Sequence, residues 1–309
     1  MFIDNLKAGM HYKLYKRRNV YDKMVVEIKN EFIPDLEYKD IILEFLSALK
    51  ESERTVFLNN LKNIKIINSN DDFEFRKGMV SGGGYDIYNN VIYINPKTAH
   101  KTLYHELFHV ATSIFDHKHK KAYSGFHQCK NVSIGRSLNE GYTQYITEST
   151  FGDKVHKVYS YDVSVMKRIE MLVGKGNLRR LYFGMDLKGL IKALEEYASY
   201  DDIINFIKTF DMVHDILNSN NLYNLSEGYV VDNLVKINKF LFKMYIIKYI
   251  GEKGCIDPDD PELIEFLMNT NLYASTSTKI YDLNCNDLVN VVLGEVADEM
   301  EKAKVNIID

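Results

Sequence analysis

Apolar side chains recur every three or four positions through residues 20–62, which is the period of an amphipathic helix. One stripe occupies residues 41–49, and a second includes Phe57 and Leu61. The spacing predicts at least two helices, separated near residue 50. We therefore expect the chain to begin with a helical region.

The pattern changes to alternation after this region. Residues 64–66 and 73–75 alternate apolar and polar side chains, as half-buried strands do. A glycine-rich run then interrupts the pattern at residues 81–84. No Lys-Ser or Lys-Thr pair follows these glycines, so a phosphate cradle is not indicated. We interpret them as a flexible loop.

Two further runs, at residues 85–88 and 91–95, are rich in strand-forming side chains. Asn89 and Asn90 separate them, and asparagine tolerates the positive φ angles of a tight turn. Pro96 ends the second run, because proline cannot donate a backbone hydrogen bond within a sheet. The sequence thus predicts a β-hairpin.

Helical spacing returns from about Thr98, with Leu103, Leu107, Val110 and Ile114 on one apolar stripe. Nearly all of the following chain has the same period, and Gly174 is a natural stop for one of its helices. These further helices are expected at residues 137–147, 162–173, 186–198, 201–217, 232–250, 261–269 and 286–303.

The changes of period predict an α+β fold that is mostly helical, with a small mixed sheet. We divide the chain into an N-terminal helical region (1–62), a mixed core (63–175) and a helical C-terminal region (176–309). The C-terminal region could close a cleft in the core or form one domain with it, and the sequence leaves both possibilities open.

Composition excludes several classes of protein. The chain has 39 Lys and Arg against 43 Asp and Glu, a net charge of −4, so no basic excess indicates a nucleic acid or an anionic membrane. Cys129, Cys255 and Cys285 form no C-x-x-C pair, so neither a disulfide framework nor a cysteine zinc site is indicated, and free thiols in a reducing compartment are the simplest expectation.

The pattern of charges also bears on the compartment. Asp4 lies in an N-terminal segment without an apolar run, so we expect no secretory signal. The most apolar long segment, 234–250, contains four lysines, which argues against a membrane span. We expect a cytoplasmic protein, with export by a signal-independent route left open.

Residues 105–109 read His-Glu-Leu-Phe-His, an H-E-x-x-H string. On a helix, His105 and His109 lie one turn apart on one face, so both imidazoles can bind one metal ion. Glu106 lies beside them, where a carboxylate can take a proton from metal-bound water. The apolar stripe of the same helix would bury it and fix the angle of the histidines.

A hydrolytic zinc site needs a third protein ligand and leaves the fourth position to water. The sequence does not continue as H-x-x-G-x-x-H, because Thr112 and Phe115 replace that glycine and histidine. Glu140, in the next predicted helix, is the best candidate. The alternative is a capping box in which Ser137 and Glu140 cap their own helix. We favour the ligand, since the two histidines have no equally well-placed partner.

The H-E-x-x-H helix, followed by Asn-Glu-Gly at residues 139–141, resembles the gluzincin branch of zinc metallopeptidases, which includes thermolysin-like and alanyl-aminopeptidase-like enzymes. The resemblance extends over roughly residues 80–175 and implies a zincin-like core. It implies one catalytic Zn²⁺, with Glu106 as the general base. Its ligands would be His105, His109 and Glu140.

Two departures from the family pattern shape the expected activity. Thermolysin-like enzymes have an aspartate four residues after the ligand glutamate, where it supports a histidine ligand; here Gln144 occupies that position, so this support must differ. Aminopeptidases of the branch carry an upstream G-x-M-E-N string that holds the substrate amine, and residues 82–86 lack its glutamate. The second departure favours an endopeptidase.

The expected reaction is zinc-assisted peptide hydrolysis. Zn²⁺ would lower the pKa of its bound water and polarise the scissile carbonyl. Glu106 would accept the water proton and pass it to the leaving nitrogen. The strand at 91–95 would hold an extended substrate by adding it to the sheet.

A donor to the developing oxyanion is also expected, and the resembling families use a tyrosine or a histidine. Tyr161, just before the next helix, is our first choice. His156 and Tyr159 come second, and Tyr142 and His127 third. With 22 tyrosines in the chain, most of them are expected to be structural.

The remaining histidines belong to no recognisable motif. His117 and His119 flank lysines in a polar segment, and we expect both to be solvated. We interpret His11, His100 and His214 as background, because the sequence indicates no partner for them.

Two other classes of function stay open. One is a catalytically silent zincin-fold module that binds peptides or proteins, and the other is a helical interaction protein in which the motif is accidental. The presence of Glu106 argues against a silent module, because a pure scaffold has no need of a base. We expect a peptide or protein substrate as partner, no nucleic acid and no membrane; the sequence does not indicate an oligomeric state.

Overall fold

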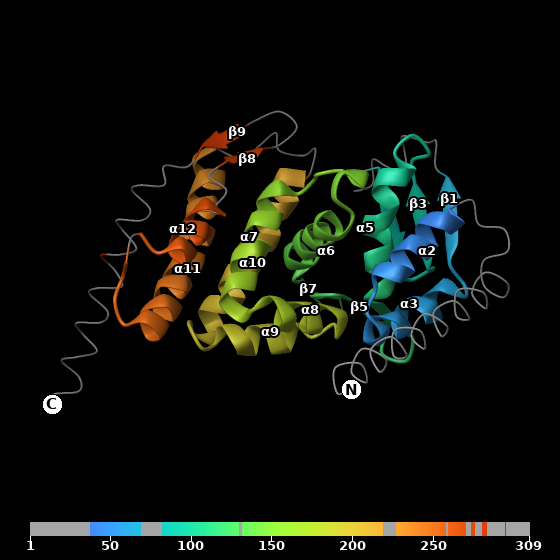
Figure 1. The fold of residues 1–309 in the computed structure, drawn as a ribbon. Coiled ribbons are helices and arrows are strands. Elements are labelled where there is room, and N and C mark those ends of the chain that lie inside the picture. The colour runs from blue at the N-terminus through green and yellow to red at the C-terminus, as the bar shows by residue number, and fades with distance from the viewer. Residues whose placement is uncertain are drawn as a thin grey trace, which may run out of the picture.

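The computed structural model describes residues 38–68, 82–129, 132–218, 227–257, 259–269, 273–275, 280–282 and 294 (Figure 1). Within them the fold is α+β and mostly helical, with a small mixed sheet, as predicted. Three predicted segments lie outside the described residues: the start of the first helical region (20–37), the strand at 73–75 and, apart from residue 294, the helix at 286–303.

The mixed sheet has the order β1-β3-β2. Strand β3 (Val91–Ile94) lies in its centre, parallel to β1 (Lys65–Asn68) and antiparallel to β2 (Gly83–Asp86). The predicted hairpin is confirmed, but β2 begins two residues before the predicted run at 85–88. The reason is the turn, where the Asp86 carboxylate accepts hydrogen bonds from the next backbone N–H groups and Asn90 has a φ of 53°.

Three helices pack beside this sheet: α2 (Lys39–Ala48), α3 (Arg54–Leu61) and α5 (Ala99–Ala111). The first two confirm the helices predicted from the N-terminal stripes. Phe45 of α2 makes aromatic contacts with Phe57 of α3 and Phe108 of α5, at ring-centroid distances of 5.0 and 4.7 Å. These contacts fix the outer side of α5, the helix that carries the H-E-x-x-H string.

Helix α5 ends earlier than the apolar stripe predicted. Ile114 lies in strand β4 and is 43% exposed, whereas Leu103, Leu107 and Val110 are fully buried. The helix ends at Ala111 because side chains bind its last carbonyl groups: the Thr112 hydroxyl donates to Phe108, and the Asn60 amide donates to Val110.

The segment after α5 forms an antiparallel sheet that the sequence pattern did not predict. Its strands are β4 (Ser113–Asp116), β5 (Lys121–Ser124), β6 (His127–Cys129) and β7 (Ser133–Ile134). The turn between β4 and β5 holds the exposed His119, which pairs with Asp116, in agreement with the solvated loop expected there. These four strands make up most of the chain between α5 and the next helix.

Helices dominate the remainder of the described chain. Gly174, with a φ of 83°, ends one of them as predicted, and the helix that follows it was not predicted. They are α6 (Arg136–Phe151), α7 (Ser160–Val173), α8 (Lys175–Phe183), α9 (Leu187–Leu194), α10 (Tyr200–Asn218), α11 (Glu227–Lys253) and α12 (Pro261–Met268). The short elements are the 3-10 turns Glu51–Glu53 and Gly152–Lys154 and the strands β8 (Tyr273–Ser275) and β9 (Ile280–Asp282).

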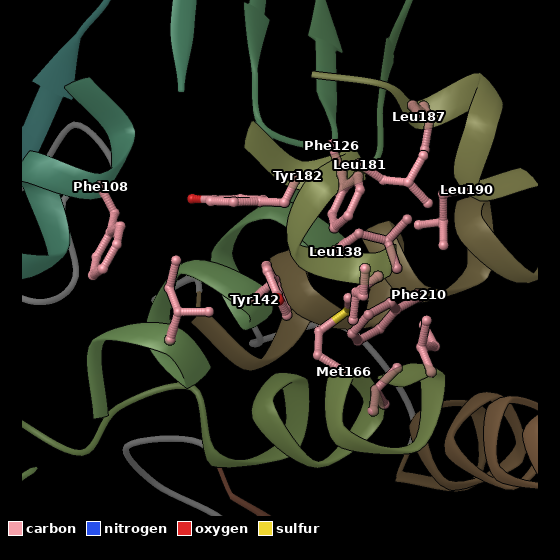
Figure 2. Close-up of a cluster of buried hydrophobic side chains, with 14 of the residues drawn as sticks. Phe108, Phe126, Leu138, Tyr142, Met166, Leu181, Tyr182, Leu187, Leu190 and Phe210 are labelled. Carbon is pink, nitrogen blue, oxygen red and sulfur yellow. The ribbon is translucent and has the colours of Figure 1, made fainter. Parts of the chain in front are cut away.

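One continuous hydrophobic core joins the three regions expected from the sequence, since its buried members run from Tyr38 to Phe266. Figure 2 shows its central part, where Tyr142 of α6 meets Phe126 and Tyr182. The Tyr182 hydroxyl forms a hydrogen bond of 2.6 Å with the Thr143 hydroxyl, so the buried polar atom is satisfied. The core holds α6 firmly beside α5 (Figure 1).

Among the helices that the structure describes, none combines the length and the apolar character that a bilayer crossing requires. Cys129 and Cys255 are free thiols, and Cys285 lies outside the described residues.

A buried ion pair joins the first helices to α8 and supports a test of the packing. Arg179 donates to both carboxylate oxygens of Glu53, at 2.7 and 2.6 Å, and the Glu53 side chain is only 6% exposed. Arg179→Ala leaves this carboxylate buried without its partner, so we expect the free energy of unfolding in urea to fall by about 3 kcal/mol.

The matched control is Lys248→Ala, which removes a surface pair with Glu252 and should cost about 0.5 kcal/mol or less. Equal effects of the two substitutions on the urea midpoint would contradict this assignment.

Candidate metal centre

Helices α5 and α6 lie side by side and bring three potential metal ligands together (Figure 1). The Nε2 atoms of His105 and His109 are 3.0 Å apart. One oxygen of Glu140 lies 3.3 Å from the first and 3.4 Å from the second. Within the described chain, these three side chains form a group that could hold one metal ion.

The triangle of ligand atoms has the size that a zinc ion requires. In a tetrahedral site with Zn–N and Zn–O bonds of 2.0–2.2 Å, any two ligand atoms are about 3.3 Å apart. The observed separations of 3.0, 3.3 and 3.4 Å agree with this spacing. Three protein ligands also leave one tetrahedral position for water or substrate, as in hydrolytic sites.

Glu140 does not cap its own helix. The residue before α6 is Gly135, with a φ of 81°, and neither Ser137 nor Glu140 forms the capping box that we considered. Asp211 of α10 takes that place: its carboxylate accepts hydrogen bonds of 2.7 and 2.8 Å from the backbone N–H groups of Gly135 and Ser137. Glu140 is therefore left to face the histidines.

The charge of Glu140 is stabilised by its position. Although burial acts in the opposite direction, His109 and His105 hold the pKa of the Glu140 carboxyl well below its usual range. The carboxylate is consequently ionised at neutral pH, which is the form that binds a metal.

Gln144 orients the first histidine. Its Oε1 atom lies 3.0 Å from His105 Nδ1, so His105 donates its Nδ1 proton and keeps Nε2 free for a metal. The Gln144 amide nitrogen donates to Glu148 and to the backbone carbonyl of His156, at 2.7 and 2.6 Å. Because these two bonds fix which end of the amide is the oxygen, Gln144 presents an acceptor to His105.

Asn139 is the corresponding neighbour of the second histidine. Its Nδ2 atom lies 3.3 Å from His109 Nδ1, and its buried Oδ1 has no hydrogen-bond partner among the described residues. A histidine that binds a metal through Nε2 carries a proton on Nδ1, which needs an acceptor. A 180° rotation of the Asn139 amide supplies that acceptor and satisfies the buried oxygen.

Glu106 faces strand β2. The backbone N–H of Tyr85 donates to its carboxylate, and burial raises the pKa of Glu106 to about 7 while His105 opposes the rise. A Cβ atom at Gly83 would lie 2.8 Å from a methyl carbon of Thr102 and 3.3 Å from a Glu106 oxygen. The interpretation of residues 81–84 as a flexible loop is therefore wrong for Gly83 and Gly84, because both lie in β2, and at Gly83 the strand needs glycine to approach α5 so closely.

The five candidates for an oxyanion donor lie in different surroundings. Tyr161 is buried against Phe210, with a ring-centroid distance of 6.2 Å, and Tyr142 lies in the core of Figure 2; no described contact joins either one to the three ligands. The Tyr159 ring lies 5.9 Å from that of His105. His156 borders a pocket beside His105, and His127 pairs with the Ser133 hydroxyl at 2.7 Å.

His214 is the residue that the sequence interpretation missed. It is not background: its Nδ1 lies 2.6 Å from a carboxylate oxygen of Asp162, and both side chains are buried. Although burial lowers the pKa of His214, the carboxylate of Asp162 raises it above the ordinary value, and Glu140 acts in the same direction. The Tyr159 ring lies 5.5 Å from that of His214 as well as beside His105, which places the imidazole near the candidate centre.

Comparisons with protein-family models, with curated proteins and with solved structures find no match to this chain.

The close approach of β2 to α5 can be tested at Gly83. Gly83→Ala inserts a methyl group against Thr102, so we expect the free energy of unfolding in urea to fall by about 2 kcal/mol. Gly251 lies in the last turn of α11, where an added Cβ would meet no other atom within 4 Å. Gly251→Ala should therefore raise the free energy of unfolding by about 0.5–1 kcal/mol. A Gly83→Ala variant as stable as the wild type would show that the strand does not lie where we describe it.

The role of Gln144 can be tested through metal affinity. Gln144→Leu removes the acceptor of the His105 proton, and we expect zinc affinity, measured by competition with a chelator, to fall about 10- to 100-fold. Tyr145→Phe is the control, because the Tyr145 hydroxyl on the same helix bonds Glu170 rather than a ligand. An unchanged affinity in Gln144→Leu would remove Gln144 from the site.

Proposed function

We propose that this chain is a zinc-dependent endopeptidase of the gluzincin type. The observation that carries the proposal is the arrangement of His105, His109 and Glu140 around one point, with the carboxylate of Glu106 beside them. An accidental H-E-x-x-H string would not require a third ligand at the right distance, nor hydrogen-bond partners behind both histidines.

The two histidines and Glu140 would hold Zn²⁺, which when bound lowers the pKa of a water molecule and polarises the scissile carbonyl. Glu106 takes the proton of the attacking water and delivers it to the leaving nitrogen. The Tyr85 N–H bonded to Glu106 orients this carboxylate before the substrate arrives.

We assign substrate binding to β2, which is an edge strand of the sheet that the described residues form, and not to the strand at 91–95. That strand, β3, is paired on both sides and has no free edge. On β2, the Gly82 carbonyl accepts a hydrogen bond from the Asn95 N–H, so alternation turns the backbone N–H and carbonyl of Gly83 and the carbonyl of Tyr85 away from β3. The Tyr85 N–H is already bonded to Glu106. An extended peptide could bond these groups directly above Glu106.

His214 is a better candidate for the oxyanion donor than Tyr161. Its Asp162 partner fixes the ring and favours the protonated form, as a donor to a developing negative charge requires. Besides Asp162, the charged groups that act on it are Glu140, which raises its pKa, and Arg136, which lowers it.

The function can be tested at Glu106. Glu106→Gln should bind zinc as tightly as the wild type but cleave peptides about 10³-fold more slowly, because the proton acceptor is lost. Zinc content by atomic absorption and cleavage of a broad peptide library are the two measurements. Full activity in the variant would exclude the mechanism, and a zinc-loaded wild type that cleaves nothing would favour the silent binding module.

The assignment of His214 gives a separate prediction in kcat and pH. Since the pKa of His214 is raised, its proton is lost at a higher pH than the proton of an ordinary imidazole, so kcat should decline as the pH rises through that range. His214→Ala should lower kcat about 10²-fold with zinc affinity retained, and should abolish that alkaline decline. His119→Ala, at an exposed surface histidine, is the control; unchanged kcat in His214→Ala would disprove the assignment.

A further inference from the structure

Tyr159 lies directly before α7 and has a left-handed backbone, with a φ of 54° and a ψ of 37°. Few residues other than glycine, asparagine and aspartate adopt this conformation, because their Cβ atom crowds a neighbouring carbonyl oxygen. Three other described residues with a positive φ are not glycine: Asn90 and Lys120 lie in β-hairpin turns, and Met185 lies between α8 and α9. Tyr159 is the aromatic member of this group.

The start of α7 does not require a tyrosine at this position. The Tyr159 carbonyl accepts a hydrogen bond of 2.8 Å from the Val163 N–H, which is a backbone contact that any residue can make. The Tyr159 side chain forms no capping hydrogen bond with the helix. Glycine or asparagine would form the same turn with less strain. The reason for a tyrosine therefore lies in the contacts of its ring.

The Tyr159 ring contacts two imidazoles of the candidate centre. Its centroid lies 5.9 Å from that of His105 and 5.5 Å from that of His214, and the ring planes are inclined by 40° and 37°. Both distances fall within the range of direct aromatic contacts. His105 is one of the three potential metal ligands, and His214 is the proposed oxyanion donor. The Tyr159 ring is therefore a shared wall for the ligand and the donor.

Hydrogen bonds restrain both imidazoles at one edge. The Nδ1 atom of His105 faces Gln144 at 3.0 Å, and the Nδ1 atom of His214 faces Asp162 at 2.6 Å. A bond at Nδ1 sets the direction of that edge, but the tilt of the ring about the bond depends on what packs against its face. Tyr159 supplies a packing surface to both rings.

We propose that Tyr159 is a positioning residue: its ring fixes the tilt of the His105 and His214 imidazoles, and the strained backbone is retained because it brings the ring to them. The aromatic ring, and not the hydroxyl group, has this role. The effect on His214 rests on the function proposed above, whereas the effect on His105 concerns metal binding alone. Strain of this kind lowers stability while it holds a defined geometry.

The test uses three substitutions in the full chain. Tyr159→Phe keeps the ring, Tyr159→Ala removes the ring but keeps Cβ, and Tyr159→Gly removes both the ring and the strain. The Ala and Gly variants should bind zinc about 10-fold more weakly in competition with a chelator. At saturating zinc, their kcat for peptide cleavage should be about 10-fold lower at a similar KM. The Phe variant should match the wild type in both measurements.

The thermal midpoint separates this role from ordinary packing. Because alanine keeps a Cβ atom at a positive φ, Tyr159→Gly should unfold about 2–4 °C above Tyr159→Ala and yet be equally impaired in zinc affinity and kcat. Recovery of both properties in the more stable Gly variant would reveal a merely structural ring and overturn the proposal.

The matched controls are Lys120→Ala and Lys120→Gly, at a φ of 50° in the exposed turn between β4 and β5. They should show the same difference in thermal midpoint with unchanged zinc affinity and kcat.

Two further results decide the proposal. Wild-type zinc affinity and kcat in Tyr159→Ala, or an equal loss of both in Tyr159→Phe, would overturn it and leave the peptidase intact. A chain that cleaves no peptide, but loses zinc affinity in the Ala and Gly variants and keeps it in the Phe variant, would support the contact with His105 and overturn the peptidase.

Discussion

Two histidines and Glu106 are buried, and Glu140 is partly buried, in one small volume between α5 and α6, and this concentration of polar groups is the constraint on which the rest of the structure depends. An ionised side chain taken out of water is costly unless it is paired or binds a metal. His105 and His109 are tied to the amides of Gln144 and Asn139, and Glu106 to the backbone of β2. The ligand atoms of His105, His109 and Glu140 face one another, and a divalent cation would satisfy all three together.

The surrounding elements can be understood as supports for this volume. Strand β2 reaches Glu106 because glycine leaves room beside Thr102. Helix α10 contributes twice: Asp211 caps the helix that carries Glu140, and His214 pairs with Asp162 beside the centre. A helix cap of this kind contributes about 1 kcal/mol, and it also fixes the position of α6 relative to α10. Helix α10 therefore joins the C-terminal region to α6 and α7.

Local patterns in the sequence predicted what depends on local spacing. The hairpin, the H-E-x-x-H helix and the stop at Gly174 follow from periodicity and turn chemistry. Ile114 was misplaced because one apolar residue at helical spacing cannot reveal that side chains of Asn60 and Thr112 end the helix before it. The short strands β4 to β7 were missed because two to four residues are too few to show alternation.

The parts of the site that the sequence could not supply are contacts between distant residues. His214 and Asp162 are 52 positions apart, and nothing in the neighbourhood of either one indicates the other. An aspartate four positions away on the same helix could be recognised from the sequence as a partner of the histidine. Asp162 lies in another helix, so the sequence gives no such indication. The order of the strands, which makes β2 and not β3 the edge, likewise depends on the parallel pairing of β1 with β3.

The most direct measurement of the central claim is a crystal structure of the zinc-treated protein with anomalous diffraction recorded on both sides of the zinc absorption edge. The account predicts one peak about 2.0–2.2 Å from Nε2 of His105, Nε2 of His109 and a carboxylate oxygen of Glu140, with its fourth position open toward Glu106 and β2. No peak at that point, or a zinc ion held by other residues while Glu140 points away from the histidines, would contradict it.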